Sequence, residues 1–161
     1  MTSAANNPPK VAVIGCGHWG KNHVRNFHAL GALAAVADAN PDLAASMSET
    51  YDVPVKDYAA ILADPAISGV VIAAPAEAHA ALAIQALEAG KHVFVEKPLA
   101  LTVAEAEGVL AAAEAAGRLL MVGHLLQYHP AFIKLTEMVR GGELGQLQYL
   151  YSNRLNLDKI R

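Results

Sequence analysis

The chain has 161 residues, about the length of one domain, and a formal net charge of -3 from 15 acidic and 12 basic side chains. The charges are scattered, which excludes a basic nucleic-acid surface, and no apolar run approaches the roughly 20 residues that span a membrane. A hydrophobic fraction of 54% predicts helices packed closely on a sheet. The single cysteine excludes an internal disulfide and fits a reducing compartment. Residues 1–9 lack the apolar centre of a secretion signal, so we expect a flexible extension and a cytoplasmic protein.

The first predicted strand, residues 11–14, runs directly into the segment GCGHWG at residues 15–20, and a helix-period segment follows. In this Gly-x-Gly-x-x-Gly pattern, Gly15 makes a tight turn, Gly17 leaves room for a pyrophosphate, and Gly20 lets the helix lie close to the strand. The unpaired amides at the start of that helix would face the phosphates. The pattern therefore predicts dinucleotide binding; the alternative is a tight turn without a ligand.

A second apolar run, residues 33–37, is followed by Asp38. An acid roughly 20 residues after the glycine segment is placed to bind the ribose hydroxyls of a dinucleotide. No arginine occurs among residues 39–43, which favours NAD over NADP, because the extra phosphate would meet a carboxylate without a cation. The alternative for Asp38 is an ordinary N-cap or turn aspartate. His18 and Trp19 are expected to line the cofactor site, with simple packing as the alternative.

The remaining elements alternate between helix and strand. Helices are predicted over residues 19–31, 41–50, 58–62, 77–89, 102–117 and 130–140, and strands over 53–55, 68–73, 91–95 and 119–123. Pro54 predicts an edge position for the strand at 53–55. The run at 68–73 lacks polar alternation, as is typical of a parallel strand covered on both faces. We therefore expect the α/β class, with a doubly wound parallel sheet of the Rossmann type.

Two charged residues, Glu96 and Lys97, stand at the end of the predicted strand 91–95 and are followed by Pro98. The carboxyl ends of strands form the edge where open α/β sheets bind ligands. A lysine held near a reacting hydroxyl can stabilise a developing alkoxide, and the proline restricts the lysine to extended backbone conformations. A solvated surface lysine is the alternative. Glu96 is expected to pair with a nearby cation or to contact the cofactor.

With the glycine segment, the acid after the second strand, residues 75–79, the turn at 89–92 and the motif at 96–98 all in order, the chain resembles the Gfo/Idh/MocA oxidoreductase family over residues 10–155. The resemblance implies an NAD(P)-dependent dehydrogenase or reductase acting on sugars, nucleotide sugars, cyclitols or related diols. It implies a nucleotide-binding N-terminal domain and a C-terminal α/β substrate domain. It also places Lys97 beside the nicotinamide and the substrate carbon that gives or takes hydride.

The same resemblance extends the cofactor site to the segment that begins at Ala74. Ala74 and Pro75 stand where many relatives have Thr-Pro, so one hydroxyl that could help to bind the cofactor is absent. His79 is expected to cap or pack at the start of the following helix, near the cofactor. Glu96 and Lys97 complete the predicted cofactor site.

The segment at residues 123–132 departs from the commoner family pattern, because Tyr128 stands where an arginine usually precedes the proline by two residues. It is similar to the branch that oxidises UDP-N-acetylglucosaminuronate at C3. Together with Lys97, His124, Tyr128 and His129 are the predicted substrate contacts.

A metal site is not expected, because the seven histidines lack the paired spacing of zinc ligands and hydride transfer can proceed without a metal. Cys16 lies near a helix N-terminus, where thiolate character is raised. We nevertheless interpret Cys16 as a small residue that fills space.

The predicted organisation is a flexible extension at 1–9, a dinucleotide-binding domain at 10–125, and a linking helix with the first strand of a truncated C-terminal domain at 126–161. The family's catalytic histidine, usually in an Asp-x-Gly-x-His-x-x-Asp segment, has no counterpart here. We therefore expect a portion of an enzyme that binds cofactor without full catalysis. One alternative is a stand-alone NAD(H)-sensing module that acts through a protein partner; another is a scaffold that binds no nucleotide.

Residues 146–154 alternate in the manner of an antiparallel strand. A strand with an unpaired edge predicts self-association, so a homo-oligomer is expected.

Overall fold

The computed structural model describes residues 8–153. This part of the chain divides into two compact units, which meet in the sequence between Gly123 and His124. None of the helices in the described residues is both long and apolar enough to cross a bilayer.

The first unit is organised around a parallel sheet, which has five strands in the described residues. In sheet order they are β2 (Leu33–Ala37), β1 (Val11–Ile14), β3 (Gly69–Ile72), β4 (His92–Val95) and β5 (Leu120–Val122). The chain moves outward from β1 to β2 and then returns to the other side of β1 at β3. The predicted α/β class with a doubly wound parallel sheet is therefore confirmed. Ligands bind such sheets at the carboxyl ends of the strands where the direction reverses.

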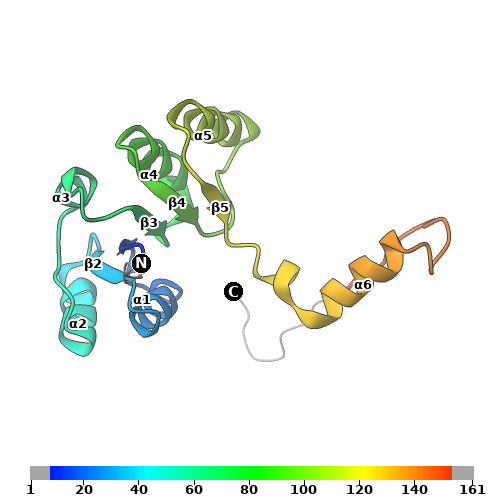
Figure 1. The fold of residues 1–161 in the computed structure, drawn as a ribbon, viewed down its shortest axis with the longest axis horizontal. Coiled ribbons are helices and arrows are strands. Elements are labelled where there is room, and N and C mark those ends of the chain that lie inside the picture. Colours follow the sequence, from blue (N-terminus) through cyan, green and yellow to red (C-terminus); the bar gives the residue numbers. More distant parts are fainter. Residues whose placement is uncertain (1–7, 154–161) are drawn as a thin grey trace, which may run out of the picture. The chain divides into compact units, whose positions relative to one another are not determined.

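Five helices of the first unit cover the two faces of the sheet (Figure 1). They are α1 (Gly20–Ala29), α2 (Pro41–Tyr51), α3 (Tyr58–Ala63), α4 (Ala76–Glu88) and α5 (Val103–Ala116). Successive strand residues point to opposite faces, so Val70 and Ile72 join the apolar core under α3, α4 and α5, whereas Val71 joins the core under α1 and α2. All four residues of β3 are buried, as the unbroken apolar run predicts.

Local capping explains where the predicted helices begin. The side chain of Asn40 accepts a hydrogen bond from the amide of Asp42 at the start of α2 (3.0 Å). Thr102 and Glu105 form the predicted capping box of α5, in which each side chain accepts a hydrogen bond from the other residue's amide. Gly117 ends the helix with a left-handed φ of 60°.

The predicted strand at 53–55 is reduced to a single bridge between Val55 and Val36 of β2. The amide of Val36 donates to Pro54 O (3.0 Å), and the amide of Lys56 donates to Val36 O (3.0 Å). Because Pro54 has no amide hydrogen, the ladder does not extend further. The edge position predicted from the proline is correct, but the length is not.

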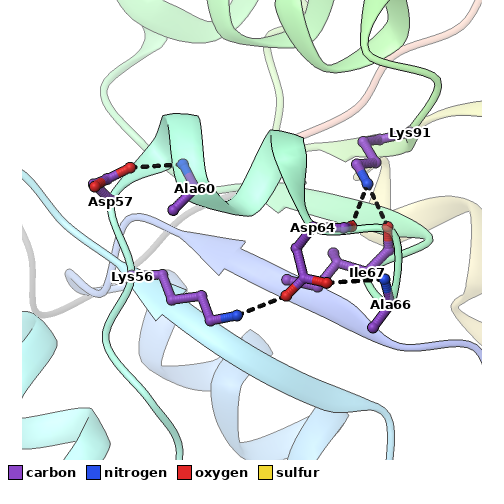
Figure 2. Close-up of polar contacts among 7 residues, drawn as sticks. All are labelled: Lys56, Asp57, Ala60, Asp64, Ala66, Ile67 and Lys91. Atoms are coloured by element: carbon purple, nitrogen blue, oxygen red, sulfur yellow. Dashed lines mark hydrogen bonds and ion pairs between the residues drawn. The ribbon is translucent and has the colours of Figure 1, made fainter.

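The amino ends of β3 and β4 are closed by a cluster of polar contacts (Figure 2). Lys91, directly before β4, is 6% exposed, and its ammonium donates to Asp64 O (2.6 Å) and to Ile67 O (2.8 Å). The carboxylate of Asp64 accepts hydrogen bonds from Lys56 Nζ (2.6 Å) and from the amide of Ala66 (2.9 Å). These bonds hold the pKa of Asp64 below its usual value, with the hydrogen bond from Lys56 as the largest cause. The polar groups in this cluster therefore form hydrogen bonds with one another.

The second unit contains a short 3-10 helix, η1 (Leu125–Tyr128), and α6 (Pro130–Arg140), which has the predicted bounds. The strand predicted over 146–154 is not formed in residues 146–153, and residue 154 lies outside the described range. A strand is stabilised by hydrogen bonds to a neighbouring strand, and no strand pairs with this segment within residues 8–153. Residues 1–7 of the predicted extension also lie outside the described range.

Candidate dinucleotide-binding site

The three glycines after β1 have different structural roles. Gly15 has a φ of 94°, and a Cβ there would lie 2.6 Å from the backbone of Ala73, directly after β3. A Cβ on Gly20 would lie 1.8 Å from Gly15 O, so the close contact of helix and turn requires both glycines. At Gly17 a Cβ would meet no atom of the described chain within 4 Å. The fold therefore requires Gly15 and Gly20, whereas a side chain at Gly17 would extend into open space.

The start of α1 presents free hydrogen-bond donors beside this space. The amides of Gly17, His18 and Trp19 donate no hydrogen bond within residues 8–153. Helix α1 has no side-chain cap and no acid in its first turn, in contrast to α2 and α5. Unpaired amides and the positive end of the helix dipole together attract an anion. The arrangement suits a pyrophosphate.

Asp38 lies at the end of β2 and is held against the glycine segment. Its Oδ2 accepts a hydrogen bond from the amide of Cys16 (2.6 Å), and its Oδ1 accepts one from the amide of Asn40 (2.7 Å). Asn40, rather than Asp38, caps α2. Asp38 is therefore no helix cap, but its bond from the amide of Asn40, two residues further on, is that of a turn aspartate. Its partly exposed carboxylate still retains lone pairs for the hydroxyls of a ribose.

Cys16 is buried beneath the turn, where its Sγ donates to Ala37 O (3.7 Å). Burial, together with the nearby charge of Asp38, raises the pKa of the Cys16 thiol to about 11. The thiol is therefore protonated at neutral pH, which supports its interpretation as a residue that fills space.

Glu96 and Lys97 are next to each other at the end of β4 but lie in different surroundings. Glu96 Oε1 is 2.8 Å from His23 Nε2 of α1, and both side chains are 15% exposed. Glu96 Oε2 accepts a hydrogen bond from the amide of Lys97 (3.3 Å). The Lys97 side chain is exposed, and its ammonium contacts no acceptor among the described residues. Glu96 thus has a partner within the chain, His23, whereas the Lys97 ammonium is available to bind a ligand.

His23 was not among the predicted site residues, although the sequence carries a signal for it. A partly buried acid at a strand end needs a partner. His23 lies on the apolar stripe of the preceding helix, next to Val24, where a polar side chain points toward the sheet.

His79 lies in α4 and is 2% exposed. Its Nε2 is 2.8 Å from Ala74 O, and its Nδ1 is 2.7 Å from Pro98 O. The ring packs near the start of α4, as predicted, and it also reaches the residue after Lys97. Ala74 is partly exposed and Pro75 directly precedes α4. The structure therefore brings the segments after β3 and after β4 together through one side chain.

The predicted substrate contacts His124, Tyr128 and His129 lie in the second unit, and all three are exposed. His129 Nδ1 accepts a hydrogen bond from the amide of Ala131 and so caps α6 (3.2 Å). A role in substrate binding stays a prediction for these residues. No group of three or more metal-ligating side chains occurs in the described part of the chain.

A glycine turn with open space, unpaired amides at a helix start and an acid at the end of the neighbouring strand define a dinucleotide-binding α/β domain. Residues 9–124 match the family model GFO_IDH_MocA, described as the oxidoreductase family with an NAD-binding Rossmann fold. The chain belongs to this family.

Similar proteins include inositol 2-dehydrogenase of Salmonella typhimurium, which is 31% identical over 158 residues. They also include UDP-N-acetylglucosamine 3-dehydrogenase of Acidithiobacillus ferrooxidans, which is 33% identical over 147 residues. The matches cover 94% and 91% of this chain but 47% and 45% of the relatives, so the chain spans about half of their length.

Among solved structures, GenD2 from gentamicin A biosynthesis, in complex with NAD, superposes with a TM-score of 0.79 at 28% identity. The match covers 89% of this chain and 42% of GenD2. Solved neighbours hold either NAD or NADP.

Proposed function

We propose that the chain is the NAD(H)-binding portion of a dehydrogenase that transfers hydride between nicotinamide and a hydroxyl carbon of a sugar, nucleotide sugar or cyclitol. The observation that carries the proposal is Gly17. The fold does not require glycine there, yet its missing side chain leaves space beside three unpaired amides. That combination fits a pyrophosphate bound through the backbone.

In the first unit, some residues bind the cofactor and another takes part in hydride transfer. The amides of Gly17, His18 and Trp19 bind the pyrophosphate, and Asp38 accepts hydrogen bonds from the ribose hydroxyls. When bound, the nicotinamide supplies or accepts the hydride. Lys97, whose ammonium is free and exposed, stabilises the negative charge that develops on the substrate oxygen.

NAD rather than NADP is the proposed cofactor. Both oxygens of Asp38 are held in place by amides, so the carboxylate stays beside the ribose position. A 2′-phosphate there would be repelled, and residues 39–43 offer no arginine to bind it.

The names of the relatives support a substrate with several hydroxyls, because they include an inositol and a nucleotide-sugar dehydrogenase. Within this class we favour a nucleotide sugar, on the pattern around Tyr128. We also propose that residues 10–125 form the cofactor domain, that 126–161 begin a substrate domain, and that the protein is cytoplasmic and homo-oligomeric.

The test uses Trp19, the single tryptophan of the chain, which is 41% exposed beside the proposed pyrophosphate site. Quenching of its fluorescence by NADH and by NADPH reports binding at that site. We expect stronger binding of NADH, a loss on the order of 100-fold in Gly17→Val, and a loss of about tenfold in Asp38→Ala, as expected for hydrogen bonds to a charged group.

Ala29→Val is the matched control, because it adds the same kind of bulk to an exposed position at the other end of α1. It should bind NADH like the parent chain. A parent chain that is folded by circular dichroism and binds neither nucleotide would overturn the proposal.

A further inference from the structure

Lys97 lies between two residues that are each contacted by a histidine from a different helix. Glu96 precedes it and meets His23 of α1, whereas Pro98 follows it and meets His79 of α4. The Lys97 side chain itself contacts no acceptor in residues 8–153. The backbone of Lys97 is thus held on both sides while its ammonium stays free.

The first contact is confined on several sides. His23 Nε2 lies 2.8 Å from Glu96 Oε1, and the rings of His23 and Phe94 pack edge to face with 5.2 Å between their centres. A Cβ on Gly123 would lie 3.1 Å from the Glu96 carboxylate, so the end of β5 closes the other side. The other carboxylate oxygen, Glu96 Oε2, accepts a hydrogen bond from the amide of Lys97. His23 therefore acts on Lys97 through the carboxylate that it orients.

The second contact is buried. Both ring nitrogens of His79 face carbonyl oxygens, Nδ1 that of Pro98 and Nε2 that of Ala74. A neutral imidazole has one N–H donor and can serve one carbonyl, whereas an imidazolium can serve both. No carboxylate oxygen lies within 4.0 Å of either ring nitrogen in residues 8–153, so the carbonyls are the polar partners of this ring. His79 therefore joins the backbone after Lys97 to the backbone after β3.

The two helices approach from opposite faces of the sheet, α1 with the core that contains Val24 and α4 with the core that contains Leu87 (Figure 1). The residues after β4 are therefore contacted from both faces of the sheet, at Glu96 and at Pro98.

We propose that His23 and His79 are positioning residues that together set the place of Lys97 at the carboxyl edge of the sheet. The proposal rests on the proposed role of Lys97 in hydride transfer. Neither histidine needs to touch substrate or cofactor for this role.

The experiment records amide spectra of the chain labelled with 15N-lysine, in which the Lys97 signal is assigned by its absence in Lys97→Arg. Two pairs of variants separate positioning from mere stability. Glutamine can place an amide nitrogen where histidine has Nε2, and asparagine can place one where histidine has Nδ1. His23→Gln therefore keeps the contact to Glu96, and His23→Leu loses it. His79→Asn keeps the contact to Pro98, and His79→Gln keeps only the contact to Ala74.

We expect the Lys97 signal of the parent chain to persist in His23→Gln and His79→Asn, and to shift or broaden in His23→Leu and His79→Gln. His28→Gln is the control, because His28 is an exposed α1 residue whose ring packs near Tyr51 instead. A purely structural role would lower the melting temperature of both His79 variants without separating their Lys97 signals. Equal Lys97 signals within each folded pair would overturn the proposal.

If the His79 variants do not fold, the His23 pair and Gly123→Ala test the proposal. The methyl group added at Gly123 would lie 3.1 Å from the Glu96 carboxylate, so the carboxylate must move slightly and the Lys97 signal should shift. An unchanged Lys97 signal in both His23→Leu and Gly123→Ala would then overturn the proposal that these contacts position Lys97. Trp19 quenching by NADH is measured on the same samples. Its absence in the parent chain would reject the proposed function, whereas the Lys97 amide would still test the two contacts.

Discussion

The two ends of β4 carry lysines in opposite environments. Lys91, directly before the strand, is 6% exposed and donates to two carbonyl oxygens. Lys97, after the strand, is exposed, and its ammonium contacts no acceptor in the described residues. The lysine before β4 thus donates hydrogen bonds to the chain at the amino edge of the sheet, whereas the lysine after β4, at the carboxyl edge, has an ammonium without a partner in the described part of the chain.

The difference extends to the groups around each lysine. At the amino edge, Lys56 and Asp64 pair with each other and the side chain of Asp64 also caps the turn. At the carboxyl edge, the amides of Gly17, His18 and Trp19 remain unpaired in residues 8–153, although the starts of α2 and α5 are capped by side chains. Donors left without partners on one edge of a sheet mark that edge as the place for a ligand.

Replacing Lys91 is expected to have the largest effect on stability. Lys91→Met removes the donors to Asp64 O and Ile67 O, and an unsatisfied buried carbonyl costs about 1–3 kcal/mol. Lys97→Met is the matched control and should change the free energy of unfolding by less than about 0.5 kcal/mol, as exposed substitutions usually do. Urea unfolding of both variants measures the difference, and similar losses would show that the two lysines do not differ in this way.

Chemical labelling should distinguish the two ammonium groups without any substitution. Acetylation of Lys91 requires local opening of the structure, whereas Lys97 is accessible in the native state. We expect Lys97 to react faster by a factor on the order of 100, since opening of packed regions costs several kcal/mol. Mass spectrometry of peptides gives the ratio, and labelling in urea is the control in which it should approach one. Equal native rates would contradict the burial of Lys91.

A smaller effect concerns acid stability at the amino edge. The pKa of Asp64 is lowered in the folded chain, chiefly by the hydrogen bond from Lys56. The stabilisation is therefore complete above the unfolded value of about 3.9 and is lost as the pH falls through the lower folded pKa. Asp64→Asn should reduce stability at pH 7 and weaken its acid dependence below about pH 4. Thermal unfolding from pH 7 to pH 2 compares the two chains, and parallel curves would refute the assignment.

Local patterns predicted the parts of the fold that depend on neighbours in the sequence. The glycine segment, the capping box at Thr102 and the start of α6 at Pro130 each follow from residues a few positions apart. The strand at 53–55 was over-predicted, because apolar content indicates a strand but Pro54 withholds a ladder donor.

The candidate site was predictable only in part. Gly15, Gly17 and Asp38 follow a known spacing, whereas the contact between His23 and Glu96 joins residues 73 positions apart. The contact between His79 and Pro98 depends in the same way on how α4 lies against the sheet. Contacts between residues so distant in the sequence are set by tertiary packing, which periodicity and spacing do not encode.

The state of Cys16 has a practical consequence. The only thiol of the chain is buried and has a pKa of about 11, so little of the reactive thiolate forms near neutral pH. A cysteine introduced at an exposed position such as Ala29 would therefore react selectively with a maleimide. Fluorophores or crosslinkers can be attached at chosen sites while the native residue beneath the glycine turn stays in place.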